Sequence, residues 1–281
     1  MKRIKPFVFM LFLSVGAFAG TYSSKFPKSE NPISEANNWI NGAVGGASLW
    51  GSVRTMPGLA FGVNEPTRFG DPTAILTGVW GPDQTVEGIV HVGAVPPKCC
   101  HEVELRLRTT ITSGSITGYE AYCSVVPKMA YCNIARWNGP NGSYWNIAEV
   151  KGIYVGDGDS LLATVTGSNP ATVTLFKNGL QIAQAIDTGA AGGGFGAFGP
   201  WTSGGPGIGF YDPIDSKWSD FGFRSFLASD TVTAVILDAL GNHQLQGAEK
   251  VGMFEKFRCI EIAFSVVIAI LLVAFLAKRV F

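Results

Sequence analysis

The chain has 281 residues, of which 47% are hydrophobic, 15% are charged and 36 are glycine. This length allows one large domain or two small ones, and the excess of glycine favours many turns over long helices. Lysine plus arginine equals aspartate plus glutamate at 21 each, which excludes a general basic field for nucleic acid.

The N-terminus has the layout of a secretory signal peptide. Positive charges within Met1–Lys5 precede the apolar run Phe7–Phe18, which ends near the small-x-small triplet Ala17-Phe18-Ala19. This run would span only about 18 Å as a helix, which is too short to cross a bilayer. We predict a signal peptide over residues 1–19 with cleavage after Ala19, and hence export. The alternative is an uncleaved anchor or a buried helix.

Residues 20–232 contain short strand-like segments separated by clusters of turn residues. In His101–Ile111, apolar residues alternate with Glu and Arg, which predicts one buried face and one face in water. Asn178-Gly179, between two such segments, predicts a two-residue hairpin turn. The pattern indicates an all-β sandwich or barrel. Further expected strands are Tyr119–Val126, Ile134–Trp137, Leu161–Thr166, Thr172–Lys177, Leu180–Ile186, Gly207–Phe210 and Phe221–Leu227.

A glycine-rich segment, Gly189–Gly209, lies late in this region. Its part Gly194–Gly199 matches the pattern G-x-G-x-x-G of dinucleotide sites, but Pro200 and Trp201 follow, so that no helix begins there. We therefore interpret the segment as a long flexible loop on the sandwich edge, either the lip of a ligand site or a flap.

The C-terminus predicts a membrane anchor. Ile262–Ala277 contains no charged residue, and counting back to Ile260 gives about 27 Å of helix. Lys278 and Arg279 follow the apolar run as a short basic tail. We expect a linker or stalk over residues 233–258 and a transmembrane helix within 259–281, with the domain outside the cytoplasm. The alternative is a buried helix of a soluble domain.

Four motifs occur in an order that resembles a known group of domains. They are Ala135–Pro140, Lys177–Gly179, Gly205–Phe210 and Asp220–Phe223. The set resembles the laminin-G-like, concanavalin A-like jelly-roll domains of bacterial surface and secreted proteins, over residues 30 to 230. The resemblance implies a two-sheet antiparallel jelly-roll sandwich. It implies no activity, because this fold hosts lectins, glycosidases, adhesion modules and spacers.

Glu102-Val103-Glu104-Leu105-Arg106 is the nearest match to the carboxylates at i, i+2 and i+4 of laminarinase-type glycosidases. Arg106 takes the third position, where an arginine would pair with a carboxylate and hold its pKa down, the opposite of what a general acid needs. We therefore interpret these residues as a charged ladder on the solvent face of a strand.

Aromatic residues beside Asn, Gly and Ser are candidate ligand contacts, because flat rings can stack on sugars. Tyr144, Trp145 and Trp201 meet this description, whereas Trp137 is assigned to the core. Asp157 and Asp159 offer oxygen ligands for Ca²⁺, which laminin-G-like domains often hold, although Asp is also a default turn residue.

The cysteines show no zinc-site spacing, and export makes disulfides plausible. The strands His101–Ile111 and Tyr119–Val126 would form a hairpin. Cys99 or Cys100 could then lie near Cys123 or Cys132. We expect at least one bridge and leave its partners open; the candidates are Cys99, Cys100, Cys123 and Cys132.

Together these features predict a membrane-anchored, extracytoplasmic β-sandwich module that binds a ligand, carbohydrate being the first choice, without catalysis. One alternative is a structural or adhesion spacer without a small ligand. The second is a glycoside hydrolase of concanavalin A-like fold. No nucleic acid partner is expected.

Overall fold

The computed structural model describes residues 20–43, 50–63, 70–96, 100–140, 142–192, 198–211 and 219–230. Contacts divide the chain into Met1–Ile236 and Leu237–Phe281, and every described residue belongs to the first unit. The predicted signal peptide, stalk and membrane anchor lie outside the described residues. Within the described ranges, no helix is long and apolar enough to cross a membrane.

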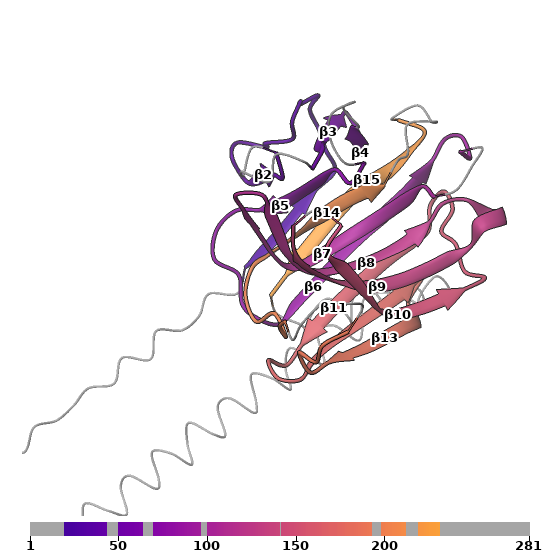
Figure 1. Cartoon of the computed structure of the whole chain (residues 1–281). Helices are drawn as coiled ribbons and strands as arrows, with labels where there is room; N and C mark the ends of the chain where they lie inside the picture. The colour runs from indigo at the N-terminus through magenta and orange to yellow at the C-terminus, as the bar shows by residue number, and fades with distance from the viewer. Residues whose placement is uncertain are drawn as a thin grey trace, which may run out of the picture. The chain divides into compact units, whose positions relative to one another are not determined.

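The described residues form two antiparallel sheets that stack face to face (Figure 1). The eight-stranded sheet contains β1 (Thr21–Ser24), β3 (Ser52–Met56), β4 (Leu59–Val63), β6 (Gln84–Val92), β11 (Ser160–Thr166), β12 (Ala171–Lys177), β13 (Leu180–Asp187) and β15 (Phe221–Ser229). Its order is β13-β12-β11-β6-β15-β4-β3, with β1 paired to β15. The predicted all-β sandwich is therefore confirmed.

The seven-stranded sheet contains β2 (Trp39–Asn41), β5 (Thr73–Leu76), β7 (Glu102–Thr112), β8 (Ser115–Ser124), β9 (Tyr131–Gly139), β10 (Tyr144–Lys151) and β14 (Gly205–Tyr211). Its order is β10-β9-β8-β7-β14-β5-β2, and a short 3-10 turn, Pro127–Met129, joins β8 to β9. The chain crosses repeatedly between the two sheets, as jelly rolls do.

The core lies between the sheets and follows the two-residue period of the strands. On β7, Val103, Leu105 and Leu107 are fully buried in it. On the opposing sheet, Leu161 and Val165 of β11 belong to the same cluster. Burial of such residues supplies the main stabilisation of a two-sheet sandwich.

The predicted hairpin turn is present between β12 and β13. Asn178 and Gly179 both have positive φ, 51° and 77°, as a type I′ turn requires. The predicted glycine-rich loop needs a correction, because from Gly205 onward the chain forms β14, between β5 and β7.

The first and last described residues meet at one corner. The backbone N–H of Gly20 donates to Asp230 Oδ1 at 2.6 Å, and the N–H of Asp230 donates to the carbonyl of Gly20 at 3.1 Å. Asp230 Oδ2 also accepts the N–H of Gly81 at 2.8 Å. This contact places β1 alongside β15.

Candidate functional site

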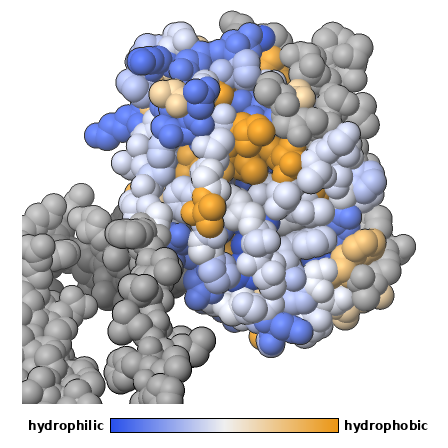
Figure 2. Space-filling model, turned by 90° about the vertical axis from the view of Figure 1, so that its left-hand side faces the viewer, coloured by the Kyte–Doolittle hydropathy of each residue, from blue (hydrophilic) through white to orange (hydrophobic). Residues whose placement is uncertain are grey.

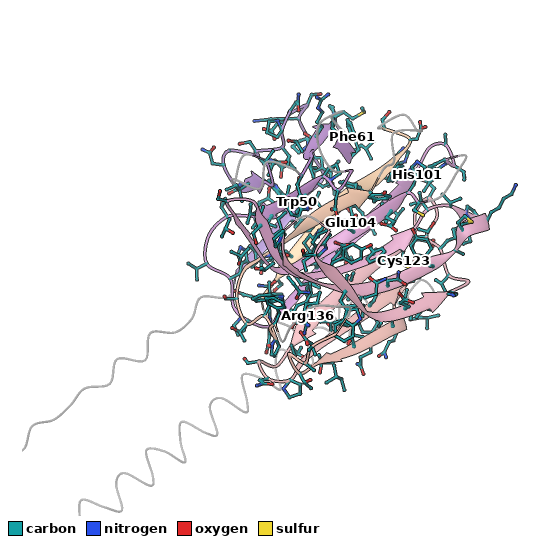
Figure 3. All side chains as sticks on the ribbon, viewed as in Figure 1. Trp50, Phe61, His101, Glu104, Cys123 and Arg136 are labelled. Atoms are coloured by element: carbon teal, nitrogen blue, oxygen red, sulfur yellow. A yellow bond between two sulfur atoms is a disulfide. The ribbon has the colours of Figure 1, made fainter. Side chains whose placement is uncertain are left out.

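The outer face of the seven-stranded sheet carries the polar residues of β7. Because Val103, Leu105 and Leu107 point into the core, Glu104 and Arg106 point to the other side. The predicted shared face of the two charged residues is thus present (Figure 3 labels Glu104).

Arg106 binds three carboxylates on this face. Its Nη2 lies 2.5 Å from Glu104 Oε2 and also donates to Asp71 Oδ1, and its Nη1 lies 2.5 Å from Glu120 Oε2. Asp71 precedes β5, and Glu120 lies opposite Arg106 on β8. We call Asp71, Glu104, Arg106 and Glu120 the Arg106 cluster; none of its side chains is more than 6% exposed.

The solvent-exposed ladder predicted for β7 is therefore wrong. Trp137 on β9 donates its indole N–H to Glu120, and its ring centroid lies 5.5 Å from the guanidinium carbon of Arg106. A buried cation over an indole face gains a cation–π attraction. Alternation shows which side chains share a face, but neighbours from distant parts of the chain decide whether water reaches it.

Gly209 on β14 leaves room for the cluster. A Cβ on Gly209 would lie 2.1 Å from Glu104 Oε2 and 2.9 Å from Arg106 Nε. Gly209 pairs directly with Glu104 across the ladder, and Gly207 pairs with Arg106. Gly209 is thus explained by the large charged side chains of the next strand, whereas a Cβ on Gly205 or Gly207 would instead meet the β5 side of the sheet.

Burial sets the protonation of these carboxyl groups. It raises the pKa of Glu120 to about 7, and it raises the pKa values of Asp71 and Glu104 above their ordinary range, although Arg106 lowers all three. The expectation that Arg106 holds a carboxyl pKa down is therefore wrong in net effect. Burial alone would lower the pKa of Arg106, but the neighbouring carboxylates raise it.

Glu102 adds a fifth charged group at the border of the cluster. It is half-buried and accepts a hydrogen bond from the hydroxyl of Tyr131 on β9. Burial raises its pKa to about 8, against the lowering effect of the Tyr131 hydrogen bond. The nearby acids Glu120 and Asp71 raise this pKa further.

The Arg106 cluster also contains the one group of potential metal ligands among the described residues. Oxygens of Asp71, Glu104 and Glu120 lie within 4.8 Å of one another. The guanidinium of Arg106 contacts all three carboxylates, so this chain's own cation fills the position that a metal would need. The donor set therefore does not fit a resident Ca²⁺.

The predicted calcium ligands lie elsewhere and are engaged in other contacts. Asp157 contacts Arg224 Nη2 at 2.8 Å and accepts the N–H of Val92 at 2.9 Å. Asp159 lies 3.0 Å from Lys177 Nζ and accepts the N–H of Gly156 at 2.7 Å. Calcium at these two residues stays a prediction, and it would have to displace both cations.

Tyr144 is the exposed aromatic residue on the face of the cluster. It is 42% exposed, and its ring centroid lies 5.0 Å from that of Trp137, its direct partner on β9. Farther along β10, the amide nitrogen of Asn146 donates to Glu149 at 2.9 Å, and Asn146 Oδ1 accepts the hydroxyl of Tyr122 at 3.0 Å. Aromatic and hydrogen-bonding groups thus share one open edge of the sheet.

The other two predicted ligand contacts do not join Tyr144. Trp145 points to the opposite side of β10, where its ring lies 5.4 Å from the guanidinium of Arg136. Trp201 packs against the core and donates its indole N–H to the carbonyl of Trp137 at 2.9 Å. Trp137 is buried as predicted, in a small cluster with Trp50 outside the main core.

One disulfide links β8 to β9. Cys123 and Cys132 lie directly opposite each other in the ladder, and their sulfur atoms are 2.05 Å apart. Cys100 is also disulfide-bonded, whereas Cys99 lies outside the described residues. The bridge holds the two strands that carry Glu120 and Trp137.

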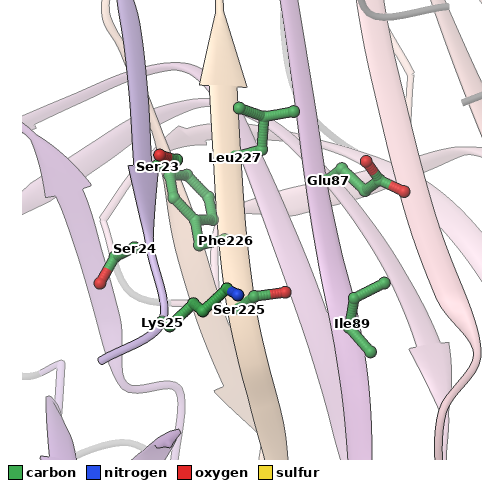
Figure 4. A pocket seen from close by; sticks show the side chains of 8 residues that line it. All are labelled: Ser23, Ser24, Lys25, Glu87, Ile89, Ser225, Phe226 and Leu227. Atoms are coloured by element: carbon green, nitrogen blue, oxygen red, sulfur yellow. The ribbon is translucent and has the colours of Figure 1, made fainter. Parts of the chain in front are cut away.

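The surface has two further features. A hollow of about 480 Å³ opens on the eight-stranded sheet over β1, β15 and β6, and Lys25 and Glu87 are its charged residues (Figure 4). Figure 2 shows hydrophobic residues gathered near the centre of one face, among hydrophilic ones. The lining of the hollow includes no predicted site residue.

No family model and no curated protein matches the sequence. Among solved structures, the chain is similar to the carbohydrate binding module CBM66 from Bacillus subtilis, with a TM-score of 0.43, 13% identity and coverage of 70% of this chain and 94% of that one. The potassium-bound carbohydrate recognition domain of Emp46p gives a TM-score of 0.43 and 11% identity, with coverage of 74% of this chain and 99% of that one. The β-porphyranase BpGH16B from Bacteroides plebeius gives a TM-score of 0.41 and 10% identity, with coverage of 75% of this chain and 92% of that one. At such values, no function transfers to this chain.

Proposed function

We propose that the sandwich binds a carbohydrate, without converting it, through the outer face of the seven-stranded sheet. The observation that carries this proposal is the exposed ring of Tyr144 beside hydrogen-bonding groups on β10. Sugar sites combine a flat aromatic surface with a few directed polar groups. Tyr144 supplies the surface, and Asn146 and Glu149 supply the polar groups.

The residues below Tyr144 hold its ring in a fixed position, which favours the binding of a ligand. Its ring rests against Trp137, which is buried and held by its hydrogen bond to Glu120. A platform fixed in this way loses little conformational entropy when a ligand stacks on it. The Arg106 cluster therefore serves as the foundation of the binding face.

The buried carboxyl groups support a non-catalytic role. A glycosidase needs two carboxyl groups that reach the scissile bond, one as acid and one as base or nucleophile. Glu104 and Glu120 are instead buried and bound to Arg106. Glu102 favours the second candidate, a glycoside hydrolase, because its pKa of about 8 suits a general acid.

The cellular setting belongs to the same proposal. The signal-like N-terminus and the apolar C-terminal run support a domain that is exported and held on the outer side of a membrane by one helix. A surface module of this kind would meet glycans outside the cytoplasm. Protease digestion of intact cells would test this arrangement, which predicts cleavage of the domain from outside.

A glycan array probed with the full chain tests the binding proposal. We expect wild type to bind at least one glycan and Tyr144→Ala to bind it about tenfold more weakly, the loss of one stacking contact. Tyr154→Ala is the matched control, since Tyr154 is 37% exposed and lies outside the site. Folded wild type that binds no glycan would favour the spacer alternative. Release of reducing sugar by wild type but not by Glu102→Gln would favour the hydrolase.

A further inference from the structure

The outer face of the seven-stranded sheet holds more acids than bases. The carboxyl groups of Asp71, Glu104 and Glu120 contact the single guanidinium of Arg106, and a fourth, that of Glu102, lies close enough for its charge to be felt. If all four were ionised, three negative charges would stay uncompensated in a poorly hydrated place. Burial of an unpaired carboxylate is costly enough that the group takes up a proton instead.

No other buried group among the described residues of this face supplies the missing positive charge. Tyr122, Tyr131 and Tyr144 face the acids from β8, β9 and β10, and burial raises the pKa of each, so that they stay neutral. Tyr211 of β14 lies opposite Glu102. The remaining charged residues of this face are Glu149 and Lys151, which are both exposed to solvent on β10.

We propose that this face binds protons when the protein folds, so that the domain is most stable in mildly acid surroundings and weakens as the pH rises through neutrality. The proposal concerns stability and is independent of whether a glycan binds. It would give an exported domain a built-in preference for an acid environment.

The sign follows from the two states. In the unfolded chain, these carboxyl groups ionise near their ordinary pKa values, about 4. In the folded chain, burial raises the pKa of Glu120 to about 7 and that of Glu102 to about 8. Between these limits the folded state holds more protons, so stability is full below the unfolded pKa and falls as the pH rises to the folded one.

Thermal unfolding of the full chain between pH 5.5 and 8.5, followed by tryptophan fluorescence, tests the proposal. We expect Tm to fall by roughly 5–10 °C as the pH rises over this range. In unbuffered solution at pH 7, unfolding should release protons. A Tm that is constant or rises with pH, or proton uptake on unfolding, would overturn the proposal.

Two glutamine variants locate the effect. Glu102→Gln cannot ionise but can still accept the Tyr131 hydrogen bond, so its Tm should fall less with pH and exceed that of wild type at pH 8.5. Glu120→Gln should flatten the profile as well; if it does not fold, Glu102→Gln alone decides. Glu149→Gln, exposed on β10, is the matched control and should follow wild type. A wild-type slope in Glu102→Gln and Glu120→Gln would contradict the assignment.

Discussion

Gly209 shows how much depends on one absent side chain. It lies on β14 directly beside Glu104, in the space that the carboxylate and the guanidinium of Arg106 occupy. A packed, charged cluster cannot shift outward without exposing or unpairing its members. The identity of this single residue therefore controls the whole network.

Replacement Gly209→Ala tests this dependence. Its Cβ would lie 2.1 Å from Glu104 Oε2, so we expect a loss of about 2–3 kcal/mol in the free energy of unfolding. Urea unfolding measures the loss. Gly156→Ala is the control, because its Cβ would meet only ordinary contacts at 3.7 Å and beyond. Equal stabilities of the two variants would show that the cluster yields easily.

At the scale of elements, Arg108 ties three chain connections to β7. Its Nη1 donates to the carbonyl of Trp201 at 2.7 Å and its Nη2 to that of Gly167 at 2.7 Å, while its Nε donates to that of Pro82. The three nitrogens of a guanidinium can donate to acceptors that lie on different sides of the group. The donors of a lysine ammonium all sit on one nitrogen, so it cannot reach three separated acceptors.

We therefore expect Arg108→Lys to lower the free energy of unfolding by about 2–4 kcal/mol, because an ammonium at the fully buried position of the Arg108 side chain cannot donate to all three carbonyl groups. Chemical denaturation followed by circular dichroism gives the value. Arg224→Lys, whose side chain is 45% exposed, should change stability by less than about 1 kcal/mol. A similar small effect at Arg108 would mean that water replaces the lost donors.

Periodicity predicted most of the later strands and none of β1 to β6. From β7 onward, except for β10, the expected segments match the strands within a few residues. In contrast, every residue of Leu59–Val63 and of Thr73–Leu76 is buried, so neither strand shows an alternating pattern. Early strands such as Trp39–Asn41 are also too short for a period to be visible.

The candidate site was predicted only in part for a related reason. The shared face of Glu104 and Arg106 follows from their spacing in one strand. Asp71, however, lies 35 residues before Arg106, and no local pattern reveals that the two side chains meet. Glu120 was missed because its own strand, β8, is buried on both faces from Gly118 onward, so that no exposed polar residues mark an outer face.

At the scale of the whole molecule, Asp230 closes the domain. Its carboxylate accepts the N–H groups of Gly20 and Gly81, which come from two distant parts of the chain. Strand β1, only four residues long, lies next to this contact. Such a short edge strand depends on the anchor at its beginning.

Replacement Asp230→Ala should loosen β1 selectively. We expect faster amide hydrogen exchange in Thr21–Ser24 and a loss of about 1–3 kcal/mol in the free energy of unfolding, since two backbone N–H groups lose their acceptor. Mass spectrometry measures the amide exchange of Thr21–Ser24. Glu149→Ala is the control for removal of an exposed acid. Equal exchange rates of β1 in Asp230→Ala and Glu149→Ala would contradict this role.

The meeting of Gly20 and Asp230 has a consequence for how such a domain can be carried. A polypeptide that enters and leaves at the same corner needs only one narrow gap in a host protein, and its sheets feel no pull from the flanking chain. Residues 20–230 could thus be spliced into a surface loop of an unrelated carrier.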